Sequence, residues 1–233
     1  MNSDTKTDDY HPLLVGLRAA RANLVPAFIV QAAMITLVLG YYYHKPTQDW
    51  LAHLAEAKRQ SGFLFSFAAG ALAGGVLPEI LLIGVFQRGR VRLDNFKNLA
   101  FGIVFWGFQA MVVDAFYRGQ ARAFGSHASF CVVSIKVFVD QFVYNPIYAG
   151  PFGNACYEWK NQGYRLAGMS RVLTKRFYKT KTLPTLVATW GVWIPLVSMV
   201  YALPSLLQIP LFSLALTFWV MVFTWINHAN RGK

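Results

Sequence analysis

The chain has 233 residues, of which 55% are hydrophobic and only 14% are charged. Soluble domains typically carry charge on about a quarter of their residues, so this composition argues against a soluble domain and favours an integral membrane protein. The formal net charge of +12 does not require a nucleic-acid partner, because basic side chains near a membrane also contact anionic headgroups.

The first four apolar segments predict four transmembrane helices. A helix needs about 20 residues to cross about 30 Å of hydrocarbon. Segments 24–43, 63–86, 98–117 and 128–150 are this long, and none contains more than two charged side chains. The N-terminal segment MNSDTKTDDY is acidic and polar, and no small-residue cleavage pattern follows a short apolar core, so we expect neither a signal peptide nor a transit peptide.

The last apolar segment, 183–227, predicts a helical hairpin. It contains no Asp, Glu, Lys, Arg or His and is about twice as long as one span requires. Pro204 and Pro210 each remove a backbone donor, so we expect the chain to turn between Tyr201 and Pro210. The predicted fold is an all-α, polytopic integral membrane bundle of about six transmembrane helices.

Basic residues are distributed unevenly between the two sides of this arrangement. Most of the 22 Lys and Arg residues fall in the two tails and in the loops after the second and fourth helices. The positive-inside rule therefore predicts that both termini lie on the cytoplasmic or equivalent side.

The stretch GMSRVLTKRFYKTK, residues 168–181, predicts one further helix. Apolar residues recur at three- and four-residue spacing, while Arg171, Lys175 and Lys179 occupy another face. This pattern is typical of an amphipathic helix on the membrane surface that binds anionic lipid headgroups. A solvated loop and a nucleotide or nucleic-acid contact are the less favoured alternatives, and we expect no nucleic-acid partner.

Small residues line one face of the second predicted helix. Ser66, Gly70 and Gly74 are spaced four apart, so another helix can approach this face closely. We favour packing inside the bundle; a hinge or a contact with a second copy of the chain is the alternative.

Four ionisable residues fall within the predicted spans: Glu79, Asp114, Lys136 and Asp140. A charge at the bilayer centre costs about 2.5 to 3.5 kcal/mol on insertion scales, so such residues usually face the bundle interior or a water-filled cavity. Asp114 and Lys136 lie towards the same side on neighbouring helices and are expected to meet. Asp140 lies one helical turn beyond Lys136 on the same face.

Two interpretations of these residues stay open. In the first, the lysine and the acids form a structural ion pair that holds helices together. In the second, they form a polar track through the bundle, biased towards cations by three carboxylates and extended by Gln109, Gln141 and Asn145.

Enzymatic chemistry has little support in the sequence. The five histidines are scattered without paired metal-ligand spacing, and no Gly-rich phosphate-binding motif is present. We therefore predict no enzyme, no metal site and no cofactor.

A series of short motifs carries a family resemblance. DQFVYNP, RVLTKRFY, WGVWIP, YALP and TFWVMVFTWI occur in this order, preceded by LDNFKNLAFGIVFWGF and FYRGQARAF. Together they resemble the family of small integral proteins of peroxisomal and mitochondrial inner membranes that includes the twenty-two-kilodalton peroxisomal membrane protein. The resemblance covers about two thirds of the chain, and the residues that match by motif are Asp140, Gln141, Pro146, Trp193, Pro195, Pro204 and Trp219.

The resemblance implies a domain plan and a function. The plan is a polar tail (1–23), an extra transmembrane helix and loop (24–60), a family-like membrane domain (61–228) and a C-terminal tail (229–233). The implied function is a channel or pore that lets small solutes or cations pass, in a peroxisomal or mitochondrial inner membrane. The alternative functions are a non-conducting scaffold or lipid-binding protein and, less favoured, an intramembrane enzyme.

Overall fold

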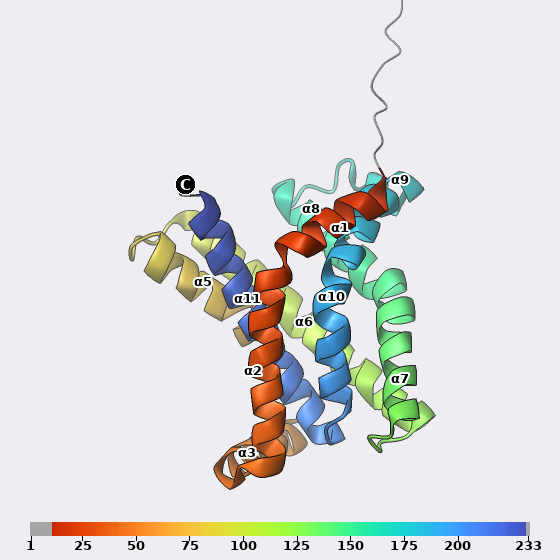
Figure 1. Ribbon diagram of the computed structural model, residues 1–233. Helices are drawn as coiled ribbons and strands as arrows, with labels where there is room; N and C mark the ends of the chain where they lie inside the picture. The colour runs from red at the N-terminus through yellow and green to blue at the C-terminus, as the bar shows by residue number, and fades with distance from the viewer. Residues whose placement is uncertain (1–10, 232–233) are drawn as a thin grey trace, which may run out of the picture. The chain divides into compact units, whose positions relative to one another are not determined.

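The computed structural model describes residues 11–231, with side chains up to residue 222, and every regular element in this part of the chain is helical (Figure 1). The chain divides into two compact units, each described separately below. Unit 1 comprises Met1–Val25 and Phe138–Ile194, and unit 2 comprises Pro26–Val137 and Pro195–Lys233. The helices, in chain order, are α1 (Pro12–Ala22), α2 (Leu24–Tyr43), α3 (Lys45–Ser61), α4 (Phe63–Ala71), η1 (Leu72–Val76), α5 (Leu77–Leu81), η2 (Leu82–Phe86), α6 (Leu93–Phe124), α7 (Phe130–Val139), η3 (Asp140–Ala149), α8 (Gly150–Asn161), η4 (Met169–Leu173), α9 (Lys175–Phe177), η5 (Tyr178–Thr182), α10 (Leu183–Tyr201) and α11 (Ser205–Arg231).

Several of these elements join end to end into six helices that are long and apolar enough to cross a membrane. They are Leu24–Tyr43, Phe63–Phe86, Leu93–Phe124, Phe130–Asn161, Lys175–Tyr201 and Ser205–Val222. The prediction of six such helices is confirmed. The third and fourth extend well beyond the predicted segments 98–117 and 128–150, because polar residues at their ends continue the helix.

Two further helices occupy segments that the sequence assigned to a tail and a loop. α1 lies within the predicted tail 1–23, and α3 fills most of the connection after α2. Each has a proline in its first turn, where the missing amide donor costs nothing. The predicted C-terminal tail is helical up to Arg231. Residues 1–10 and 232–233 of the two tails lie outside the described residues.

The predicted amphipathic helix over residues 168–181 is wrong as a single element. A 3₁₀ turn, η4, ends before Thr174, whose backbone is extended. The Thr174 hydroxyl then accepts a hydrogen bond from the Phe177 amide at 3.2 Å and so caps the start of the fifth long helix. Arg171 therefore belongs to a different element from Lys175 and Lys179.

The turn of the predicted hairpin lies at Ala202–Pro204, between α10 and α11, as expected. Two side chains satisfy carbonyl groups there. Gln208 donates to the Leu203 carbonyl at 3.1 Å, and Tyr42 of α2 donates to the Ala202 carbonyl at 3.3 Å. Pro210 lies inside α11 rather than in the turn.

Close packing of α4 and η1 against α6 forms the core of unit 2. A Cβ atom at Gly70 would lie 2.4 Å from the Ala110 Cβ, and one at Gly75 would lie 2.7 Å from the Gly102 carbonyl carbon. Only glycine permits two helix backbones to approach this closely. The small-residue face therefore packs inside the bundle, as we favoured from the sequence.

A proline shapes the fourth long helix within unit 1. Residues 140–149 form a π-helix, in which a carbonyl pairs with the amide five residues later. The partner of the Gln141 carbonyl would be the nitrogen of Pro146, which has no hydrogen. The Trp190 indole of α10 donates to this carbonyl at 3.2 Å, and the Tyr178 hydroxyl donates to the Pro146 carbonyl at 3.2 Å. Side chains of the fifth long helix thus compensate for the proline in the fourth.

We predict opposite effects of alanine at two glycines. Gly75→Ala would force α6 away from η1 and lower the stability of the protein by about 1 to 3 kcal/mol. Gly84→Ala, in open space, is the matched control and should be neutral or slightly stabilising, because alanine restricts the unfolded chain. Thermal unfolding in detergent micelles measures both. Equal melting temperatures for the two variants would contradict the proposed close contact.

Candidate functional site

Three helices of unit 2 bring four polar side chains to one buried point. Lys58 lies near the end of α3, Ser66 lies on α4, and Asp114 and Arg118 lie one turn apart on α6. Lys58 follows Leu51 by two helical turns, so both side chains lie on the same buried face of α3. Lys58 and Asp114 each expose only 3% of their side chains, whereas Arg118 exposes 45%. We call these four residues the Asp114 cluster.

The carboxylate of Asp114 is the centre of the hydrogen bonds in this cluster. It accepts from the Lys58 ammonium, from the Ser66 hydroxyl at 2.7 Å and from Arg118 Nε at 2.9 Å. The Lys58 ammonium also donates to Ser66 Oγ at 2.6 Å and to the Gly62 carbonyl at 2.8 Å. All three protons of the ammonium therefore have acceptors.

The electrostatic balance of the cluster is positive. Burial lowers the pKa of Lys58, and the hydrogen bond to Asp114 opposes that shift. One carboxylate faces one ammonium and one guanidinium, so a single positive charge remains on the cluster as a whole. The Arg118 guanidinium also lies 4.7 Å from the centre of the Phe63 ring, a favourable cation–π distance.

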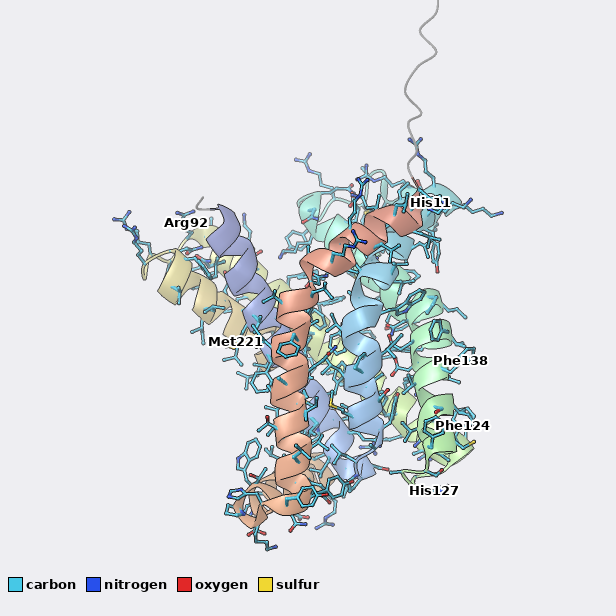
Figure 2. The ribbon with its side chains drawn as sticks, viewed as in Figure 1. His11, Arg92, Phe124, His127, Phe138 and Met221 are labelled. Atoms are coloured by element: carbon cyan, nitrogen blue, oxygen red, sulfur yellow. The ribbon has the colours of Figure 1, made fainter. Side chains whose placement is uncertain are left out.

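A pocket of about 290 Å³ opens beside the cluster. It is lined by the end of α3, the second half of α6 and the first turns of α11. The lining residues are Lys58, Arg59, Gly62, Asp114, Tyr117, Arg118, Ala121, Ser205, Leu206, Gln208 and Ile209. Figure 2 labels Arg92 and Phe124, which mark the two opposite ends of α6. The pocket belongs to the Phe124 end.

Glu79, which the sequence placed in a polar track, lies elsewhere in unit 2. Its carboxylate accepts a hydrogen bond from Asn95 at the start of α6, and both residues are buried. Asn95 and Asp114 are separated by about 28 Å along α6 at 1.5 Å per residue. Glu79 and Asp114 therefore do not belong to one local site.

The expected meeting of Asp114 with Lys136 is wrong. Asp114 pairs with Lys58 and Arg118, which occupy both of its oxygens. Lys136 is buried on α7, and no described carboxylate of unit 2 forms an ion pair with it. Its ammonium lies 5.8 Å from the centre of the Tyr201 ring.

Three predicted residues do come together in unit 1. Asp140 accepts hydrogen bonds from the Gln141 amide at 3.0 Å and the Asn145 amide at 3.3 Å. The π-helix favours the second bond, because residues five apart lie on the same side of its wider turn. This group does not line the pocket of unit 2.

The three predicted headgroup-binding residues are also in unit 1. Arg171 forms an ion pair with Glu158 of α8, and Lys175 and Lys179 lie at the start of the fifth long helix. They do not lie on one continuous helical face, because the extended backbone at Thr174 separates η4 from the helix that follows.

Sequence reasoning missed Lys58, Ser66 and Arg118. Lys58 was counted among loop residues, although Leu51 and Lys58 have helical spacing. Asp114 and Arg118 have the four-residue spacing of a helical ion pair, which was a detectable signal. Nothing local could have indicated Ser66 as a partner, because the contact joins residues 48 positions apart.

No group of three or more His, Cys, Asp or Glu residues in the described part of the chain has an arrangement that could hold a metal ion. The two cysteines, Cys131 and Cys156, are both free.

Neutralising Asp114 should strongly destabilise the protein. Asp114→Asn leaves the Lys58 ammonium buried without its anion, and breaking a buried pair in this way costs about 3 to 5 kcal/mol. Asp49→Asn is the control, since its ion pair with Lys45 is exposed and such pairs contribute at most about 1 kcal/mol. Unfolding in detergent micelles measures both losses.

A double variant tests whether the loss comes from the unpaired charge. Replacing both partners, as Lys58→Met with Asp114→Leu, should destabilise less than Asp114→Asn alone. The single variants Lys58→Met and Asp114→Leu provide the comparison. If the loss of stability in the double variant equalled the sum of the losses in these two single variants, the cluster would not depend on mutual neutralisation.

Comparisons with family models, with curated proteins and with solved structures gave no match to this chain. The resemblance carried by the short motifs therefore stays a prediction.

Proposed function

We propose that this protein is a multi-pass membrane channel or pore-like protein that lets small solutes pass. The observation that carries the proposal is the pocket beside the Asp114 cluster, where charged side chains within an apolar helical unit border an open space. Purely structural ion pairs need no such space. Charged residues within membrane spans are expensive and usually mark solute or ion pathways.

The positions of the charges modify the expected selectivity. The sequence favoured cations on the basis of three carboxylates. Asp114 is neutralised by two cations, so it no longer contributes to that bias. We therefore propose a small-solute pathway whose entrance, in unit 2, is the pocket, with Lys58 and Arg118 beside it.

A modification experiment tests whether the pocket lies on the pathway. The chain has only two cysteines, so Cys131→Ser with Cys156→Ser gives a background without thiols. Ala121→Cys then places one thiol in the pocket wall, and Ala100→Cys places one on an exposed position of the same helix. A charged methanethiosulfonate reagent should reduce solute flux in proteoliposomes at least several-fold for Ala121→Cys alone.

The flux assay uses a series of solutes of increasing size and different charge. Liposomes without protein provide the baseline. Flux no greater than this baseline for every solute would overturn the proposed function. Flux that is blocked equally at both positions would remove the pocket from the pathway.

A second candidate, a lipid-binding scaffold, is favoured by the charge of unit 1. Unit 1 contains nine described Lys and Arg residues but only two described acids, and one of these acids, Asp140, is buried. Leu13, Leu14 and Leu17 of α1 are exposed beside Arg18 and Arg21. Apolar and basic side chains on one short helix are typical of contact with an anionic membrane surface.

Charge reversal distinguishes this candidate. Anionic lipid should raise the melting temperature of the wild type in nanodiscs, and reversal of Arg171, Lys175 and Lys179 to Glu should remove most of that increase. The same three substitutions should leave flux through the pocket unchanged if transport is the function. An equal lipid response of both proteins would exclude this basic segment as the binding surface.

A further inference from the structure

The walls of the pocket in unit 2 carry an excess of positive charge. Its lining includes three cations, Lys58, Arg59 and Arg118, and one acid, Asp114. Glu56, one turn before Arg59, forms two hydrogen bonds with that guanidinium, and these hold the pKa of Glu56 at about 2. Glu56 therefore stays charged and offsets Arg59. The remaining charge is that of the Asp114 cluster, which is positive.

Only one cation of the cluster has donors to spare. The ammonium of Lys58 uses its three protons on Gly62, Ser66 and Asp114. Arg118 uses Nε and Nη2 on Asp114, and a guanidinium has five N–H donors. Its Nη1 group has no partner among the described residues, while nearly half of the side chain is exposed. Arg118 is thus fixed in position but still able to bind.

The start of α11 adds further donors at the same pocket. Ser205 and Leu206, in the first turn of this 27-residue helix, line the pocket. The first amide groups of a helix have no partners inside the helix, and they favour a negative charge. Guanidinium and helix terminus therefore border the same space.

The size and the remaining walls of the pocket limit what it can hold. About 290 Å³ lies just below the range of small-molecule sites, which is about 300 to 1,000 Å³. Ala121, Leu206 and Ile209 provide apolar walls. This combination suits an organic molecule with one anionic group better than a bare inorganic ion.

We propose that the pocket binds a small organic anion through a carboxylate or phosphate group held by Arg118, with the first turn of α11 facing the same group. Arg118 binds the anion, and Asp114 is a positioning residue that orients the guanidinium. The carboxylate of Asp114 does not repel the anion, because Lys58 and Arg118 together exceed its charge. This inference rests on the proposed function, since it names the class of solute that enters the same pocket.

Binding of defined anions to the purified full-length protein tests the inference. The protein is placed in nanodiscs of phosphatidylcholine and titrated calorimetrically with inorganic phosphate, a four-carbon dicarboxylate and a sugar phosphate. A neutral sugar and an organic amine serve as controls. We expect the organic anions to bind, and the neutral and cationic controls not to bind.

Substitutions of Arg118 identify the contact. Arg118→Gln should weaken anion binding at least tenfold, and Arg118→Lys should retain part of it, because lysine keeps the charge but loses the planar fork. Arg122→Gln, one turn further along α6 and outside the pocket lining, should bind like the wild type. Unchanged affinity in Arg118→Gln would overturn the proposal.

Two additions keep the test decisive. If Arg118→Gln fails to fold, Ala121→Trp retains the guanidinium but fills the pocket, and it should abolish binding of the organic anions; retained binding overturns the proposal.

Nanodiscs containing phosphatidic acid or phosphatidylglycerol test whether the anionic group belongs to a lipid. Arg118-dependent stabilisation by these lipids, without binding of free anions, supports the same chemistry with a headgroup as its source. An absence of both responses overturns it.

The outcomes also separate this inference from the proposed function. Arg118-dependent anion binding without flux in proteoliposomes would support the anion site and overturn the proposed transport function. Flux of neutral or cationic solutes, with no Arg118-dependent binding of an anion, would support the transport function and overturn the anion site.

Discussion

The pairing of Asp114 with Lys58 is the constraint on which the organisation of unit 2 depends. An isolated carboxylate in an apolar bundle is unstable, and so is an isolated ammonium. Their neutralisation requires the end of α3 to approach the second half of α6, with Ser66 of α4 between them. The glycine contacts of α4 and η1 permit this approach, because they bring the helix backbones together at residues 102–110 of α6, directly before Asp114. Charge and packing thus select the same arrangement.

The same pairing explains why a pocket can exist at this point. Arg118 gives the cluster one more cation than it needs for neutrality, and its side chain is partly exposed. A surplus charge is best solvated by water or by an anion, and the space beside the cluster provides room for either. Structural and functional interpretations of these charges are therefore compatible: Lys58 and Asp114 neutralise each other in the interior, and Arg118 is the member of the cluster that stays partly exposed.

The sequence predicts the six long helices well and the polar contacts poorly. Runs of apolar residues determine the helices, and this signal is local. α3 was missed because its polar composition resembles a loop, although Leu51 and Lys58 mark a buried face. Asp114 was recognised as important, but its partner was misassigned to Lys136, since the succession of two long helices along the chain does not fix which of their turns meet. Glu79 of α5 pairs with Asn95 at the start of α6, far along that helix from Asp114, which no hydropathy pattern reveals. Only the Asp140, Gln141 and Asn145 group is close in sequence and was correctly brought together.

The proline of the fourth long helix makes two positions that are distant in the sequence, 146 and 190, depend on each other. Pro146 leaves the carbonyl of Gln141 without an amide, and the Trp190 indole replaces it. A chain with an ordinary amide at position 146 has no need of a donor at position 190, and a chain with another residue at 190 has an orphaned carbonyl. The two positions are therefore expected to vary together over evolution, so a pair of substitutions, rather than either alone, is the step that replaces this hydrogen bond by an ordinary backbone one.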